Sequence, residues 1–249
     1  MRIIGVYHIK GGVGKTAAAV NLAFCAARDR YRTLLCDLDP QGAASFYLRI
    51  KPPRKLSGKK LLKAQKTVSR SIRATDFDYL DLLPSDFSFR NLDLLLDQNK
   101  KSREKLEAIL TPLKDDYDLI FLDCPPNITL VSENVFNASD ALLIPLIPTT
   151  LSVLTFEKLV QFFQEAGLDQ RKLWPFFSMV EKRKRLHQQL LNDLPGQYQQ
   201  LLESQIPFSA DVEKMGLFRE PVGVFRPRAT AAQAYRTLWQ ECRRRFGLK

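Results

Sequence analysis

A glycine-rich loop near the start of the chain constrains the fold more than any other feature. The segment K-G-G-V-G-K-T at 10–16 follows an apolar, β-branched run at 2–9, and the helix-forming stretch AAAVNLAFCAARD comes directly after it. Glycines let the backbone N–H groups of such a loop turn inward around phosphate oxygens, where a Cβ would obstruct them. The N-terminus of the following helix favours the same anion. The sequence therefore predicts a strand, a phosphate-binding loop and a helix in immediate succession.

The residues of this loop suit a nucleoside triphosphate. Lys15 supplies a point charge for the β- and γ-phosphates, and the Thr16 hydroxyl suits Mg²⁺. The alternative, a glycine-rich turn beside a lysine, does not account for the flanking strand and helix. The predicted nucleotide-binding residues are Gly11, Gly12, Val13, Gly14, Lys15, Thr16 and Ala17.

Apolar strands alternate with helical stretches along the rest of the chain. The expected strands lie at 2–9, 32–39, 79–84, 117–123, 140–146 and 173–180, and the expected helices include 101–114, 128–138 and 152–166. Pro175 weakens the last strand or places it near an edge. This alternation predicts an α/β fold: a single doubly wound domain over 1–249, with a mostly parallel sheet covered by helices on both faces. We also expect an exposed basic insertion at about 51–73 and a closing helix at about 230–246.

Three aspartates follow apolar strands and complete the expected site. Asp37 and Asp39 end one strand, and Asp123 follows the apolar run of another. Ligands of open α/β sheets bind at the carboxyl ends of the strands, and an acid there can hold Mg²⁺ through water. Each aspartate alone could instead cap a neighbouring helix. Together with the loop they favour a magnesium–nucleotide site, with Thr16, Asp39 and Asp123 as the residues nearest the metal.

Charge is segregated along the chain, whose formal net charge is +11. Residues 51–73 contain nine Lys or Arg and no acid, residues 74–170 have a net charge of −10, and residues 171–249 have a net charge of +8. One such run alone is often a solvated face. Two basic blocks around an acidic middle favour a polarised surface that attracts nucleic acid or anionic lipid.

Cysteine usage and hydropathy favour a cytoplasmic protein. The four cysteines are scattered, with no C-x-x-C pair, which suggests a reducing compartment and neither a disulfide framework nor a zinc site. No apolar run reaches the roughly 18 residues of a membrane-spanning helix.

The motifs K-G-G-V-G-K-T, D-L-D-P-Q-G and F-L-D-C-P-P, in this order, resemble the deviant Walker A, A′ and Walker B motifs of the ParA/MinD ATPases. The resemblance covers nearly the whole chain and includes the late segments IPFSADVEK and AAQAYRTLWQE. It implies a P-loop NTPase fold, ATP and Mg²⁺ as cofactors, and slow ATP hydrolysis that a partner stimulates. It also implies an ATP-dependent homodimer that hydrolysis releases.

The resemblance further implies roles for particular residues. Lys10 would reach across a dimer interface to phosphates held by the partner subunit, and Lys10, Lys15 and Asp39 would be the catalytic residues. Asp39 would help to place the attacking water or the metal shell, and Asp123 would sense the γ-phosphate. Pro207 and Ser209 would line the base pocket. Two positions depart from the family pattern: Ala17 stands where many relatives have a second Thr, and Ser209 stands where many have Asn.

ParA-like proteins bind DNA without sequence preference as dimers, which implies nucleoid association in the ATP-bound state. The basic run after the strand at 173–180 is the best candidate for phosphate contact, and its residues are Lys182, Arg183, Lys184 and Arg185. The activity implied is partition or positioning of a cargo, such as a chromosome or plasmid locus or a protein assembly like a carboxysome. An activating ParB-like or cargo-adaptor protein would be the partner.

Two alternatives compete with this hypothesis. The tail from 231 to 246 has the spacing of an amphipathic helix, which would suit a MinD-like membrane switch. We favour docking of its apolar stripe onto the sheet, so a membrane partner is not expected. An iron–sulfur relative on the same fold would need two cysteines per subunit at the dimer axis, and only Cys124 lies beside a motif.

Overall fold

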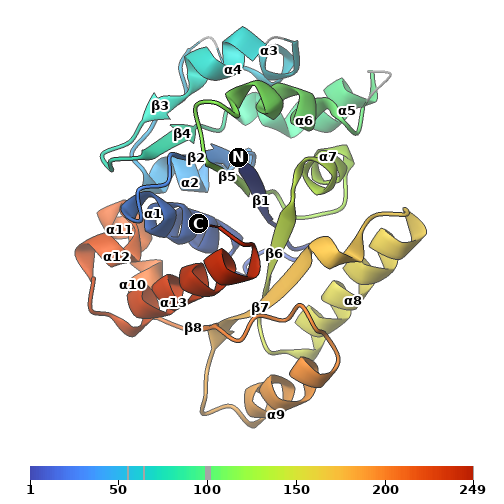
Figure 1. Cartoon of the computed structure of the whole chain (residues 1–249), viewed down its shortest axis with the longest axis vertical. Helices are drawn as coiled ribbons and strands as arrows, with labels where there is room; N and C mark the ends of the chain where they lie inside the picture. Colours follow the sequence, from blue (N-terminus) through green and yellow to red (C-terminus); the bar gives the residue numbers. More distant parts are fainter. Residues whose placement is uncertain (55, 64, 99–101, 249) are drawn as a thin grey trace.

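A single eight-stranded sheet organises the chain in a computed structural model that describes residues 1–54, 56–63, 65–98 and 102–248 (Figure 1). The strand order is β3-β4-β2-β5-β1-β6-β7-β8, and every pairing is parallel except β3 with β4. The strands are β1 (Arg2–Val6), β2 (Thr33–Asp37), β3 (Arg73–Ala74), β4 (Leu80–Leu83), β5 (Leu119–Asp123), β6 (Ala141–Leu146), β7 (Leu173–Val180) and β8 (Gln205–Pro207).

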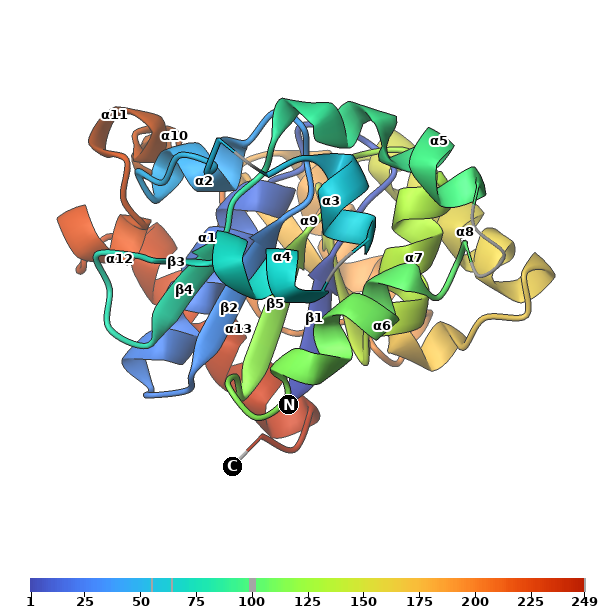
Figure 2. The same cartoon turned by 90° about the horizontal axis from the view of Figure 1, so that it is seen from above.

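Helices cover both faces of this sheet, as the sequence predicts. Strands β2, β5 and β6 are buried along their whole length, because parallel strands linked by helical crossovers carry apolar side chains toward both layers. The helices are α1 (Lys15–Arg28), α2 (Ala43–Tyr47), α3 (Gly58–Lys63), α4 (Gln65–Ser71), α5 (Leu92–Asp97), α6 (Lys105–Leu110), α7 (Leu130–Ala138), α8 (Thr150–Glu165), α9 (Arg185–Asp193), α10 (Ala210–Glu213), α11 (Met215–Phe218), α12 (Val222–Phe225) and α13 (Thr230–Arg245). One core contains α1 and α13, and the other contains α5 to α8. Figure 2 shows α3, α4 and α6 in front of the sheet.

The last helix, α13, docks onto the sheet through its apolar side. Trp239 and Leu238 are buried, and α13 packs along α1. Asp29, at the end of α1, accepts hydrogen bonds from the Trp239 indole at 2.9 Å and from Arg243 at 2.8 Å. The expected docking is therefore confirmed, and the apolar stripe is covered by the protein. Within the described ranges, no helix has the length and apolar character needed to cross a bilayer.

The basic insertion at 51–73 is partly buried, although the sequence predicted an exposed segment. It contains the helices α3 and α4, and Leu61 and Val68 are buried in the core beside α5. Residues 55 and 64 of this expected insertion lie outside the described residues. Leu61 and Val68 anchor the segment to the core, while most of its described cations are exposed.

Other differences from the expected elements have local causes. The helix expected at 101–114 is shorter, with α6 ending at Leu110 and a 3-10 turn following at Thr111–Leu113, where Pro112 interrupts helical hydrogen bonding; residue 101 lies outside the described ranges. Pro175 lies inside β7, whose pairing with β8 begins only at Phe177. Strand β8 therefore does not pair with β7 at Pro175, which agrees with the prediction that this strand lies near an edge of the sheet.

Candidate nucleotide site

The phosphate loop joins β1 to α1 with a backbone that requires glycine. Gly12 and Gly14 have φ angles of +74° and +92°, a left-handed region that other residues rarely adopt. Gly14 is also the N-cap of α1, and it offers no side chain to the first helical N–H groups. The first turn of α1 carries no acidic residue. Free N–H groups and the positive end of the helix dipole thus favour an anion at this loop.

The two lysines of the loop differ in their surroundings. Lys15 is 7% exposed, and its Nζ donates a 3.0 Å hydrogen bond to the Lys10 carbonyl. Burial lowers the pKa of Lys15, while the nearby charge of Asp123 opposes the shift. Lys10 is partly exposed, and its backbone N–H donates to His8 Nδ1. Among the residues that the structure describes, the Lys10 ammonium group forms no ion pair or hydrogen bond.

Two aspartates lie side by side at the carboxyl edge of the sheet. Asp37 of β2 is in register with Asp123 of β5, and both are fully buried. Asp37 Oδ2 accepts hydrogen bonds from the Ser45 N–H at 2.8 Å and from the Ser45 hydroxyl at 2.6 Å. Asp37 Oδ1 and both oxygens of Asp123 accept no hydrogen bond within the described chain. Asp39 lies just beyond β2, partly exposed, and accepts from the Gln41 N–H at 2.9 Å.

Burial makes the charged form of both acids costly, and the nearby charge of Lys15 offsets only part of this cost for Asp123. Burial raises the pKa of Asp37 to about 6, while its hydrogen bonds from Ser45 oppose the shift. Burial, and then the charge of Asp37, raise the pKa of Asp123 well above its ordinary range. A cation would relieve both effects, and carboxylate oxygens are the ligands that Mg²⁺ prefers.

The aspartates do not form an all-protein metal cage. No group of three or more Asp, Glu, His or Cys side chains converges within the described ranges. Mg²⁺ usually keeps several waters and binds one or two carboxylates together with substrate phosphates. The unpaired oxygens of Asp123, with Thr16 at the start of α1, fit a metal held partly by nucleotide.

A small hollow of about 50 Å³ lies beside the phosphate loop. Pro207 and Ser209, the residues expected to line the base pocket, border it together with Gly14 and Ala17. The Ser209 hydroxyl is engaged, because it accepts from the N–H of the second residue after it and caps α10. Sequence reasoning missed the other lining residues, which are Ser178, Met179, Ile206, Phe208, Val212, Glu213 and Tyr235.

The basic run after β7 is exposed and lies outside the phosphate site. Lys184 forms an ion pair with Glu181, and Arg185 begins α9. Lys182 and Arg183 line a second hollow of about 580 Å³. Pro207 and Phe208 line this hollow as well as the base hollow, so β8 and the residue after it form a wall shared by the two.

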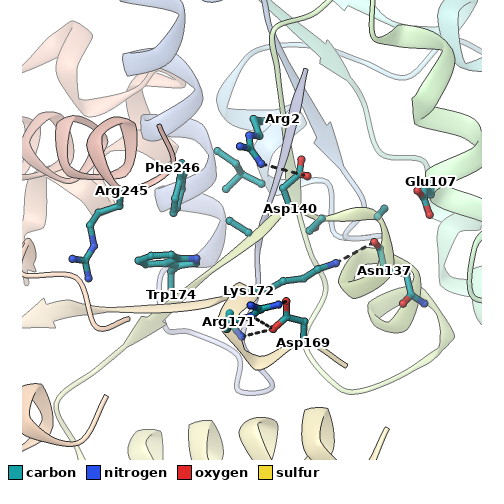
Figure 3. A pocket seen from close by; sticks show the side chains of 14 residues that line it. Arg2, Glu107, Asn137, Asp140, Asp169, Arg171, Lys172, Trp174, Arg245 and Phe246 are labelled. Carbon is teal, nitrogen blue, oxygen red and sulfur yellow. Dashed lines mark hydrogen bonds and ion pairs between the residues drawn. The ribbon is translucent and has the colours of Figure 1, made fainter. Parts of the chain in front are cut away.

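A further hollow of about 530 Å³ opens at the opposite edge of the sheet (Figure 3). Its cations already have partners: Lys172 donates to carbonyls at the end of α7, Arg171 pairs with Asp169, and Arg2 pairs with Asp140. The Arg245 guanidinium lies over the ring of Trp174 and donates to a backbone carbonyl. Because these charges are satisfied within the protein, this hollow lacks the free donors of the phosphate loop.

Comparison with known proteins agrees with the geometry of the loop. A family model described as an AAA domain matches residues 1–173. The chain is 30% identical to the chromosome partitioning protein ParA of Myxococcus xanthus (strain DK1622), over 98% of this chain and 88% of that protein. The chain belongs to the ParA/MinD family of ATPases. The chain is therefore a partition or positioning ATPase.

Two solved structures share the ParA/MinD fold with this chain. The ATP complex of a substituted McdA from Cyanothece aligns with a TM-score of 0.83 at 20% identity, covering 100% of this chain and 97% of that one. Cobyrinic acid a,c-diamide synthase from Mycobacterium smegmatis, with an ATP analogue and magnesium, aligns with a TM-score of 0.80 at 24% identity, covering 100% and 96%. The shared fold and the nucleotides bound there agree with the ATP and Mg²⁺ expected from the sequence.

Proposed function

We propose that the chain dimerises around ATP, with Lys10 of each subunit reaching phosphates held by the other. One observation carries this proposal: the Lys10 ammonium group lies at the phosphate loop and has no partner within the described part of its own subunit. Its carbonyl already accepts the Lys15 hydrogen bond, which ties the backbone of Lys10 to the loop. Because the backbone of Lys10 is fixed and its ammonium group is free, Lys10 is suited to contact a neighbouring subunit.

Within each subunit, different residues would bind the phosphates, place the attacking water and contact the base. The loop N–H groups and Lys15 hold the phosphates, while Asp39 orients the attacking water. Thr16 and Asp123 would hold Mg²⁺, which would supply positive charge to the phosphates. Pro207 and Ser209 border the base. Because phosphoryl transfer depends mainly on positioning and charge stabilisation, a site completed only in the dimer hydrolyses ATP only there.

The dimer is tested by light scattering after size-exclusion chromatography, with a slowly hydrolysed ATP analogue and Mg²⁺. The unaltered chain should shift from monomer to dimer. Lys10→Ala should bind the analogue, measured by fluorescence titration, yet stay monomeric. Lys114→Ala, which removes an exposed lysine far from the loop, is the matched control and should dimerise normally. A dimer of Lys10→Ala as stable as that of the control would contradict the proposal.

The dimer would bind duplex DNA without sequence preference. Support comes from the exposed basic run of Lys182, Arg183, Lys184 and Arg185, three of which have no acidic partner within the described ranges. Contacts made only to phosphates carry no sequence information and weaken steeply with salt. The chain, acting as one domain over 1–249, would then associate with the nucleoid in its ATP state.

DNA binding is tested by fluorescence anisotropy with labelled duplexes of unrelated sequence. Binding should require ATP, should fall with salt, and should be lost in Lys15→Ala. Substituting Lys182 and Arg183 by Ala should weaken binding to all duplexes equally. Binding that ignores nucleotide would argue against the switch. A ParB-like or cargo-adaptor protein that stimulates hydrolysis would release the DNA, and through it the chain would partition or position its cargo.

A further inference from the structure

The basic insertion carries cations that the protein itself does not neutralise. Five of its charged side chains are exposed and form no ion pair within the described chain: Lys51, Arg54, Lys59, Lys60 and Arg70. Some exposed arginines elsewhere pair with a carboxylate, as Arg32, Arg49 and Arg103 do, whereas Arg183 and Arg185 of the run after β7 are likewise in no ion pair with a described residue. We call the five cations of the insertion the insertion surface. Neighbouring cations without acids between them attract a polyanion.

The insertion surface is held on a packed base. Leu56, Leu61 and Val68 are buried beneath it. The Gly58 N–H donates a 2.8 Å hydrogen bond to the Ser88 hydroxyl, which fixes the start of α3. A surface anchored in this way loses less conformational entropy when a ligand binds than a free loop would. The cations of α3 therefore form a prepared contact.

The insertion surface lies far from the basic run that follows β7. Its helix α4 leads directly into β3 at one end of the sheet order, whereas the run at 182–185 follows β7 near the other end. Figure 1 places α3 and α4 at one end of the longest axis of the molecule and α9 at the other. Strands β4 and β7 are five pairings apart, which corresponds to about 24 Å at the usual spacing. The two basic surfaces therefore cannot share one phosphate.

We propose that the insertion surface is a second contact for the phosphate backbone of duplex DNA, separate from the run at 182–185. The inference rests on the DNA binding proposed above. A protein interface usually centres on buried aromatic or apolar anchors, and a lipid surface requires apolar side chains that insert. None of the exposed large apolar side chains belongs to the described part of 51–73. Phosphate contact needs only lysine and arginine, which is what this surface offers.

The test compares two double variants that change the net charge equally. Lys59→Glu with Lys60→Glu reverses the insertion surface on α3, while Lys114→Glu with Lys158→Glu reverses two exposed lysines in the acidic middle of the chain. Duplex affinity is measured by anisotropy with ATP and Mg²⁺ over a series of salt concentrations. The insertion variant should bind roughly tenfold more weakly, with a salt slope shallower by about 2, because two phosphate contacts are lost. The control should keep the slope of the unaltered chain.

The outcomes separate the inference from the proposed function. Nucleotide titration and thermal unfolding establish that each variant is folded; if the insertion variant unfolds, Lys59→Gln with Lys60→Gln takes its place, with the same expected loss of slope. An unaltered chain that binds DNA while the insertion variant matches the control overturns this inference alone. An unaltered chain that does not bind DNA with ATP overturns the proposed function and the inference with it. The inference is also overturned if the unaltered chain binds anionic vesicles in preference to DNA and the insertion variant loses that vesicle binding.

Discussion

Replacing Asp123 by Asn should stabilise the nucleotide-free protein while weakening its response to ATP. The carboxyl group is fully buried, neither of its oxygens accepts a hydrogen bond within the described chain, and Asp37 lies opposite it in register. Removing the charge of Asp123 removes a desolvation penalty and a repulsion, which together outweigh the lost attraction to Lys15. The amide keeps the shape of the side chain, so the packing of β5 should survive.

The expected gain in the free energy of unfolding follows from the burial of the Asp123 carboxyl group. Leaving a buried polar group without partners costs about 1–3 kcal/mol, and a charged group costs more. The Asn amide also lacks partners, so the net gain should be about 2 kcal/mol. For a chain of this size, about 2 kcal/mol corresponds to a rise in Tm of about 4–8 °C.

The gain in stability from Asp123→Asn should also depend on pH. Folding raises the pKa of Asp123, so the folded protein holds this proton more tightly than the unfolded chain does. Stability contributed by the protonated group is therefore full below the ordinary carboxyl range and is lost as pH rises through the raised pKa. Asn has no such dependence, so the advantage of the variant should grow with pH and disappear in acid.

The assay is thermal unfolding at several pH values, with and without Mg²⁺–ATP. At ligand concentrations of about 100 times Kd, binding stabilises a protein by about 2.7 kcal/mol, and the variant should lose much of this gain. Asp118→Asn is the matched control just before the same strand, since its carboxylate bonds Arg32 at 2.7 Å. The control should lower stability slightly. A nucleotide-free Asp123→Asn protein that melts below the unaltered chain at alkaline pH refutes the reasoning.

Three further substitutions test other parts of the structure. Burial lowers the pKa of His8 from 6.5 to about 4, so its contribution to stability is full above pH 6.5 and is lost as pH falls toward 4; His8→Gln should remove about 3 kcal/mol of this dependence, measured by urea unfolding across that interval. Gly5→Ala would place a Cβ 2.6 Å from Leu142 Cδ2 and should cost about 1–3 kcal/mol, whereas Gly196→Ala meets no atom within 4 Å and should be nearly neutral in the same denaturation assay. Glu241 is buried and accepts two backbone N–H hydrogen bonds ahead of β8, so Glu241→Ala should lower the free energy of unfolding by about 3 kcal/mol; a loss below about 1 kcal/mol would show that water replaces the carboxylate.

The parts of the fold predicted correctly are those with strong local signals. The loop glycines require particular backbone angles, and the long apolar runs of β2, β5 and β6 are buried on both sides, so sequence alone identified them. Strands β3 and β8 were missed because they have only two and three residues. Such short strands are set by their neighbours in the sheet, and their own composition carries little signal.

Residues within the sequence motifs of the site could be predicted, whereas residues that the fold brings to the site from other elements could not. Pro207 and Ser209 were expected beside the base, and they line the hollow next to Gly14. Met179 and Tyr235 line the same hollow from β7 and α13, and no local pattern marks them, because only the assembled sheet brings these elements together. Asp37 was expected among the acids of the site but was not assigned to the metal, and two hydrogen bonds from Ser45 hold one of its oxygens, a contact that no local pattern marks.

Strand β8 and the residue that follows it stand between two hollows of the protein. Its final residue, Pro207, and the following Phe208 line both the hollow beside Gly14 and the basic hollow of Lys182 and Arg183. Phe208 is tethered by its backbone N–H to the carbonyl of Val180, at the end of β7. Because the same two residues line both hollows, a shift of Pro207 and Phe208 would change the shape of both at once.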